Sequence, residues 1–395
     1  MVFGPHACHC VCCAAPRGGG PAGKPVPNFL SKRTRLGRPS GAKQRGAAIL
    51  LAMLTVTLVA SFAAAALWQQ WRSVEVESAE RARVQASWIL TGALDWARLI
   101  LREDARSGAQ GSPPVDHLGE PWAVPLEEAR LSTFLAADSN GVATVDDQTE
   151  RAFLSGSIED MQGRLNVRNL IGSDRAVIDA VAFKQFFKLF DLLGLPQGEL
   201  ESLAENLRLA SEPSTNSQST AGAPLLPTRM SHLAWLGLSA RTLAVLEPFV
   251  FVPPNSVVGP RSAGAAPTPL AIRTPLNINT ASEEVLFAAI DGLDLADAKR
   301  IVSIRAQAHF QKITDLDQVV TGLGTKIAGL NTQDAAVRLY SVNSSFFEVL
   351  GRLRLDQATV QERSLVSRQG VEVTTQWRER GVVDPALSKP RQPGP

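Results

Sequence analysis

A long uncharged stretch near the N-terminus constrains the fold of this 395-residue chain more than any other feature. No charged side chain occurs in residues 46–71, and residues 47–67 read AAILLAMLTVTLVASFAAAAL. An α-helix rises about 1.5 Å per residue, so about 20 apolar residues cross the hydrocarbon core of a bilayer. Trp68 and Trp71 follow directly, where tryptophans anchor a helix at the membrane interface. We therefore predict one transmembrane helix over residues 47–71.

The charges on the two sides of this stretch predict how the chain is oriented in the membrane. Residues 1–46 carry eight basic and no acidic side chains, which leaves 32 basic against 38 acidic residues in the remainder. Basic flanks stay in the cytoplasm, so we expect a basic cytoplasmic leader and a bulk that lies on the other side of the membrane. The mildly acidic remainder argues against binding of nucleic acid. A secretory signal peptide cleaved near Ala63–Ala66 is the alternative.

All four cysteines lie in the leader, at positions 8, 10, 12 and 13. Beyond residue 46 the sequence therefore offers no thiol for a disulfide or for thiolate chemistry. A zinc site built on Cys10 and Cys13 with His6 and His9 is an alternative that lacks a second ligand pair on a folded frame.

The helical pattern continues past the membrane segment, over residues 72–104. Residues 72–102 contain no proline, and small or apolar residues recur there every three or four positions. This spacing makes one narrow packing face on a helix, with charged residues on the remaining surface. The face consists of Ala79, Ala82, Ala86, Leu90, Ala93, Ala97 and Leu101. The alternative is a single-pass anchor followed by an unrelated helical stalk.

The rest of the chain predicts a sheet interrupted by a helical insertion. Residues 105–174 contain short alternating segments, among them Val142–Val145 and a hairpin around Gly163. The hairpin strands are expected at Phe153–Asp160 and Arg164–Asn169.

Helical periodicity dominates residues 175–340, and polar or proline-rich linkers are expected at residues 211–224 and 253–275. Helices are predicted over Val177–Leu193, Glu199–Ala210 and Ser239–Leu246, and again from Ser282 to about Leu330. Residues 341–382 alternate as three strands, Phe346–Leu355, Thr359–Ser367 and Val371–Arg380, with a turn at Arg368–Gly370. The proline-rich tail 383–395 is expected to be disordered.

Four segments, read in order, resemble the minor pseudopilin K family of type II secretion systems, over residues 43–381. The first is the junction of Gly46 and Ala47 with the apolar helix, which is similar to a prepilin processing site. The others are Asp116–Ala123 (DHLGEPWA), Ile158–Asn166 (IEDMQGRLN) and Leu276–Ser282 (LNINTAS). The resemblance implies an α+β, pilin-like fold: a long N-terminal transmembrane α-helix and an antiparallel sheet, with a large inserted α-helical domain containing helix-hairpin-helix-like (SAM-like) repeats.

The resemblance also implies a function and a set of partners. A prepilin peptidase would remove residues 1–46 by cutting between Gly46 and Ala47. Most pilins carry Glu at the fifth mature position, whereas this chain has Leu51 there, an omission shared by the K family and tied to a place at the filament tip. Major pilins usually begin with Phe, so Ala47 is a departure that bears on the efficiency of N-methylation.

The implied protein is a non-enzymatic subunit anchored in the inner membrane, with its bulk in the periplasm. Its work would be to nucleate the pseudopilus and to support export of folded proteins across the outer membrane. Its partners would be the minor pseudopilins I, J and H, the major pseudopilin, the prepilin peptidase, the inner-membrane assembly platform and the lipid bilayer.

Residues 277–330 also resemble the tandem helix-hairpin-helix modules of competence DNA receptors. The Gly322–Lys326 turn keeps the Gly-x-Gly form that lets backbone N–H groups approach a phosphate. The turn at Asp291–Asp294 carries carboxylates that would repel a phosphate, so a packing module is favoured over DNA capture.

Neither catalysis nor a resident metal has support in the sequence. The histidines beyond the leader, His117, His232 and His309, are far apart in the sequence and lie outside any hydrolase motif. No cofactor is therefore expected to be required. Calcium is a possibility because some similar pseudopilins bind it, and Asp138, Asn140, Asp146 and Asp147 are oxygen donors in one loop without EF-hand spacing. A solvated turn is the simpler interpretation of that loop, so the ligands are left unassigned.

Overall fold

The computed structural model describes residues 45–108, 115–133, 151–172, 177–211, 224–255, 273–331, 338–355 and 358–382. It divides into two compact units, residues 1–72 and residues 73–395. The leader up to residue 44, the tail 383–395, the expected strand Val142–Val145 and most of both linkers lie outside the described residues.

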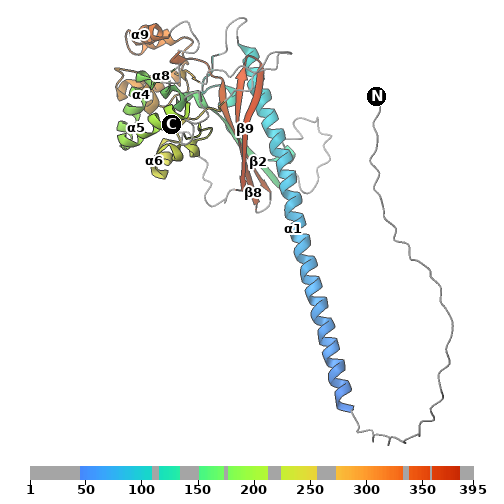
Figure 1. Cartoon of the computed structure of the whole chain (residues 1–395). Coiled ribbons are helices and arrows are strands. Elements are labelled where there is room, and N and C mark those ends of the chain that lie inside the picture. The colour runs from blue at the N-terminus through green and yellow to red at the C-terminus, as the bar shows by residue number, and fades with distance from the viewer. Residues whose placement is uncertain are drawn as a thin grey trace, which may run out of the picture. The chain divides into compact units, whose positions relative to one another are not determined.

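Helix α1 runs without interruption from Arg45 to Ser107, a length of 63 residues, and is drawn from blue to cyan in Figure 1. The described side chains from Ala47 to Arg81 are all exposed. Burial begins at Ala86, where the helix starts to pack on the chain's own sheet. The pattern of the sequence therefore predicted the continuous helix.

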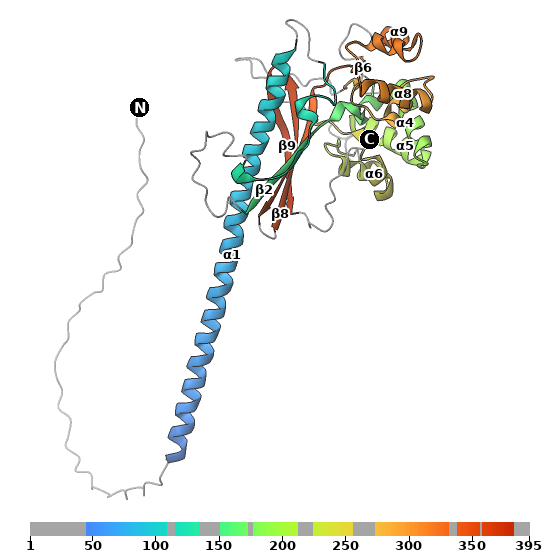
Figure 2. The same cartoon turned by 180° about the vertical axis from the view of Figure 1, so that it is seen from behind.

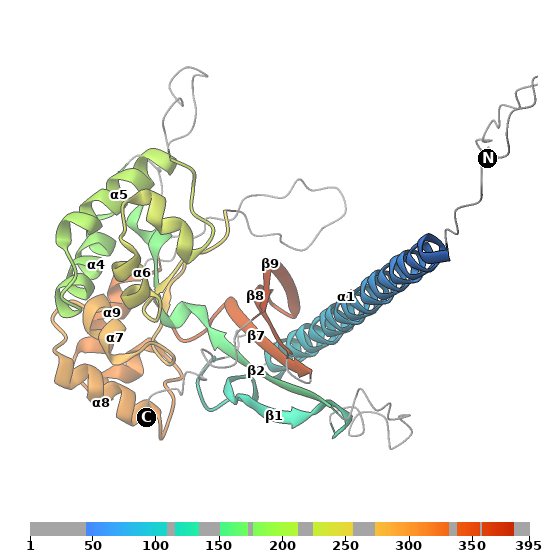
Figure 3. The same ribbon diagram turned by 90° about the horizontal axis from the view of Figure 1, so that it is seen from below.

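The sheet is antiparallel and has five strands in the order β1-β2-β7-β8-β9, as Figure 3 shows. Strands β7, β8 and β9 form the predicted meander at the C-terminal end of the chain. The bounds are β1 Leu126–Arg130, β2 Ala152–Asp160, β7 Phe346–Leu355, β8 Ala358–Gln369 and β9 Glu372–Val382.

One face of the sheet covers the C-terminal half of α1. Leu94, Ala97 and Leu101 of the helix cluster with Phe347 and Val366 of the sheet. Since side chains alternate along a strand, Leu365 points to the opposite face. There it clusters with Met161, Phe251 and Phe346.

The hairpin predicted around Gly163 is wrong. Strand β2 already has β1 and β7 on its two edges, so it has no edge left for the following segment. A 3₁₀ turn, η2 (Met161–Gly163), directs the chain away, and β3 (Leu165–Asn166) instead pairs in parallel with β4 (Val250–Phe251).

The insertion is helical, as predicted, and Figure 2 shows α4, α5, α6, α8 and α9 gathered in it. Buried leucine, isoleucine and phenylalanine side chains form its core, including Phe186, Leu203, Leu286 and Ile301. Its helices are α4 Ala180–Leu192, α5 Gln197–Ser211, α6 Ala240–Leu246, α7 Glu283–Ala289, α8 Leu295–Arg305 and α9 Leu323–Leu330. The 3₁₀ segments are η1 Pro121–Ala123, η3 Val167–Leu170, η4 Met230–Leu236 and η5 Ile313–Gln318.

Local capping explains where several of these helices begin. The Asp179 carboxylate accepts hydrogen bonds from two backbone amides of α4, and the Ser282 hydroxyl accepts one from Val285 at the start of α7. Such caps satisfy backbone donors that have no partner inside the helix. Near the end of the insertion, β5 (Leu276–Asn277) and β6 (Tyr340–Ser341) pair in parallel and bring its last 65 residues back to the sheet.

Candidate functional site

The first candidate site is the uncovered N-terminal half of α1. Its large apolar side chains are strongly exposed, for example Leu51 at 67% and Phe62 at 68%. The hydroxyls of Thr55, Thr57 and Ser61 donate to carbonyls one turn earlier in the helix. Because no polar group is left without a partner at these three positions, the segment suits a bilayer or the core of a helix bundle.

The residues singled out in the sequence lie along this half as follows. Gly46 and Ala47 fall in the first turn of α1. Trp68 and Trp71 are 65% and 61% exposed, and their ring centroids are 5.6 Å apart. An adjacent pair of exposed indoles fits an interfacial anchor, which stays a prediction.

The predicted packing face of α1 divides into two parts. Ala86, Leu90, Ala97 and Leu101 are buried and Ala93 is half-buried, all on the side of the helix that the sheet covers. Ala79 is exposed and Ala82 half-buried. Packing against other helices through this face therefore stays a prediction for Ala79 and Ala82 only.

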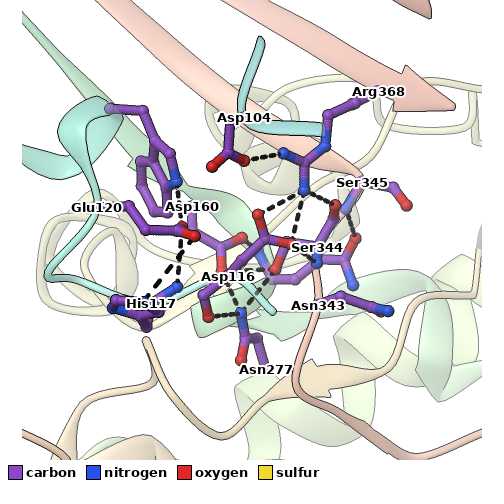
Figure 4. Close-up of polar contacts among 12 residues, drawn as sticks. Asp104, Asp116, His117, Glu120, Asp160, Asn277, Asn343, Ser344, Ser345 and Arg368 are labelled. Carbon is purple, nitrogen blue, oxygen red and sulfur yellow. Dashed lines mark hydrogen bonds and ion pairs between the residues drawn. The ribbon is translucent and has the colours of Figure 1, made fainter. Parts of the chain in front are cut away.

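The second candidate site is a buried polar joint between α1, the segment before η1, strands β2 and β8 of the sheet, and the insertion, shown in Figure 4. At its centre Arg368, at the end of β8, donates to Asp104 of α1 at 2.5 Å and to Asp116 at 2.5 Å. The side chains of Arg368 and Asp116 are 4% and 0% exposed. The turn predicted at Arg368–Gly370 is thus too early: β8 continues to Gln369, and Gly370 makes the turn with φ +56°.

Asp160 fastens the insertion to the sheet. Its carboxylate accepts from the Asn277 amide at 3.0 Å and from the Thr280 hydroxyl at 2.6 Å, both in the insertion. It also accepts from the Ser344 hydroxyl at 2.6 Å and from the backbone N–H of Gln162 at 2.7 Å. Four donors therefore converge on one buried carboxylate.

Glu120 and two histidines form the rim of the joint. The Glu120 carboxylate accepts from the indole of Trp122 at 2.5 Å and from the backbone N–H of His117 at 3.1 Å. The His117 ring stacks on His309 of the insertion, with ring centroids 3.6 Å apart and planes 8° from parallel.

Burial controls the protonation of these groups. Removal from water raises the pKa of Asp116 to about 7, against the opposing pull of Arg368, and raises the pKa of Glu120 to about 7. Burial likewise raises the pKa of Asp160. Burial and the neighbouring His309 ring lower the pKa of His117, so its neutral form is favoured.

Within the described residues, Asp104, Asp116 and Glu120 each offer one carboxylate oxygen, and these three oxygens lie within 4.8 Å of one another. Three carboxylates suit calcium chemically, but the guanidinium of Arg368 already occupies the position of the cation beside two of them. The loop residues considered for calcium from the sequence, Asp138, Asn140, Asp146 and Asp147, lie outside the described residues.

Sequence reasoning found part of this joint. Asp116 and Asp160 lie in segments singled out as motifs, but no role was assigned to them. Asp104 and Arg368 were missed, because they lie 264 residues apart and no local pattern joins them. The available signal in the sequence was Asp104, an aspartate that follows the apolar helical face at its C-terminal end.

Comparison with known proteins places these features in a family context. Two family profiles described as type II secretion system protein K match residues 163–255 and 276–338. Type II secretion system protein K of Pseudomonas aeruginosa is 28% identical over 79% of this chain and 85% of its own length. The protein K of Pectobacterium carotovorum is 24% identical over 86% of this chain and 97% of its own length.

The fold is also similar to a solved structure. A chain of the GspK–GspI–GspJ complex from the enterotoxigenic Escherichia coli type 2 secretion system superposes with a TM-score of 0.50. The sequence identity is 17%, with 77% of this chain and 98% of that chain covered. This likeness supports the mixed architecture of a long apolar helix, an antiparallel sheet and inserted helices.

Proposed function

Because the chain belongs to the protein K family of type II secretion systems, whose members are structural minor pseudopilins, we propose that it lies at the tip of the periplasmic pseudopilus. There it nucleates assembly and supports export of folded proteins across the outer membrane. The observation that carries this proposal is α1: one helix joins an uncovered apolar half to a half that is packed on an antiparallel sheet. The tip position is supported by Leu51, since the apolar half lacks the carboxylate that would pair with the amino terminus of another subunit inside the bilayer.

The chain is itself a substrate in this proposal. A prepilin peptidase cuts between Gly46 and Ala47, and the apolar helix remains as a single inner-membrane anchor with the bulk of the chain in the periplasm. Gly46→Val, expressed beside the peptidase, leaves residues 1–46 attached and is detected as a larger product by mass spectrometry. Ala48→Val is the matched control and is processed normally. A processed Gly46→Val product, or a natural N-terminus other than Ala47, overturns the assignment.

The proposed partners are the minor pseudopilins I, J and H, the major pseudopilin and the assembly platform. The exposed Ala79 and the half-buried Ala82 are the part of the small-residue face that remains open to a neighbouring helix. Full-length chain co-expressed with tagged I and J should co-purify in mild detergent. Ala79→Arg should weaken this recovery, whereas Arg81→Ala, on an exposed neighbouring position, should not. Failure of the chain to co-purify with either partner contradicts the tip assignment.

The helix pairs α7–α8 and η5–α9 act in this proposal as helix-hairpin-helix-like packing modules. The cation expected beside a DNA phosphate, Lys326, instead donates to the Asp291 carbonyl at 3.2 Å. The Asp291 carboxylate lies 2.9 Å from Lys184, so the turn has its own internal charge pairing. DNA binding that weakens steeply with added salt would contradict this role.

We further propose that the protein is not an enzyme and requires no cofactor. Calcium bound by the oxygen donors of residues 138–147 is the alternative. Treatment with a chelator should leave co-purification with I and J unchanged. Loss of the complex in chelator, restored by calcium, would show that a metal is required.

A further inference from the structure

The contacts that hold the end of the insertion on the sheet pass through the buried polar joint. Asn277 and Thr280 reach Asp160, and the Gln162 amide donates to the Pro275 carbonyl at 3.0 Å. His309 stacks on His117. The ionisation of this joint therefore bears directly on whether the insertion stays in place.

The joint contains more carboxyl groups than its one guanidinium can neutralise. Asp104, Asp116 and Glu120 lie within 4.8 Å of one another, and Asp160 adds a fourth carboxylate. Within the described residues, Arg368 is the one guanidinium or ammonium group in ionic contact with these four. In a site removed from water, four ionised carboxylates around one guanidinium repel one another strongly.

The charged and titratable groups facing Asp116 come from every element around it. Helix α1 contributes Asp104, the segment before η1 contributes His117 and Glu120, β2 contributes Asp160, and β8 contributes Arg368. The insertion contributes His309.

We propose that this joint is a proton-operated latch. A proton held on Asp116 or Glu120 keeps the insertion closed on the sheet, and loss of that proton loosens Asn277–Thr280 from Asp160. The latch regulates how firmly the inserted domain is held. It is argued from contacts and charges within this chain, so its test is separate from that of the proposed place in the pseudopilus.

The direction of the effect follows from linkage. Asp116 and Glu120 have a raised pKa in the folded chain, so their contribution is fully present in acid and is lost as the pH rises through about 7. A proton bound in the closed state and released on opening changes the opening equilibrium about tenfold per pH unit between the ordinary carboxyl pKa, about 4, and about 7. Above about pH 7 the closed state has also lost the proton, so the equilibrium no longer changes with pH.

Amide hydrogen exchange of the full chain in mild detergent tests the latch, with a chelator present so that no cation replaces the proton. The reporter is the peptide that contains the Ile278 amide, which donates to the Ser341 carbonyl at 3.0 Å. After correction for the intrinsic exchange rate, its protection should fall about thirtyfold between pH 5 and pH 6.5 and become constant above about pH 7. Peptides from β8 and β9 in the same sample should keep theirs.

The variant Asp116→Asn/Glu120→Gln removes the titrating protons while keeping similar shapes. It should lose the pH step and remain protected at pH 8.5, whereas Glu372→Gln, an exposed carboxyl on β9, should keep the step. A flat profile in the unmodified chain overturns the proposal, and so does an unchanged step in the double variant. The unmodified chain decides the question even if the double variant folds poorly.

Discussion

Two glycines of helix α9 offer a test of how the insertion is packed. A Cβ at Gly324 would lie 2.6 Å from the Ile313 carbonyl oxygen and 2.8 Å from that of Thr314, both backbone atoms. A Cβ at Gly329, one and a half turns later in the same helix, would meet nothing within 4 Å. Gly324 therefore permits the close approach of α9 to η5, and Gly329 has no such role.

The expected change in the free energy of unfolding is the sum of two opposing contributions. Gly324→Ala gains up to about 1 kcal/mol from helix propensity. A contact 2.6 Å long cannot be relieved by rotating a side chain, so η5 and α9 must move apart, and overpacking of this kind costs about 3 kcal/mol. The expected net loss is about 2 kcal/mol, whereas Gly329→Ala should be neutral or gain up to about 1 kcal/mol.

The assay is the urea dependence of protease sensitivity of the α8–α9 region in the full chain. The Gly324→Ala midpoint should fall and the Gly329→Ala midpoint should stay or rise. Equal behaviour of the two variants would refute the argument that backbone approach, rather than turn conformation, requires Gly324.

Three further predictions concern α1 and the joint. Leu101→Ala should lower the free energy of unfolding by about 2–5 kcal/mol because Leu101 is fully buried, and Leu99→Ala, at a position 47% exposed, by less than about 0.5 kcal/mol; urea midpoints compare the two. Arg368→Met should cost about 3–5 kcal/mol at pH 8, since it leaves carboxylates buried without their cation, and less at pH 5, where protons replace it; equal losses at both values would contradict this. Because the pKa of His117 is lowered, the stability it contributes is present above pH 6.5 and is lost as the pH falls through the lowered value. When the pH is lowered from 7 to 5, the melting temperature of His117→Gln should therefore change more favourably than that of the unmodified chain. Equal changes in the two proteins would contradict the stability contribution assigned to His117.

The sequence by itself determined the features that depend on neighbours along the chain. The length and composition of the apolar stretch predicted the membrane-length part of α1, because the bilayer fixes how many apolar residues a span needs. Alternation predicted the meander β7–β9, and helical periodicity predicted the helices that follow Ser282. These signals are local, so one chain is enough to read them.

Only the tertiary structure decided which distant segments meet. It gave both edges of β2 to β1 and β7, so the expected hairpin at Gly163 does not form. It covered Ala86–Leu101 with the chain's own sheet, leaving Ala79 outside. It joined Asp116 to Arg368 across 252 residues, where burial, which no local pattern encodes, raises the pKa of the carboxyl group.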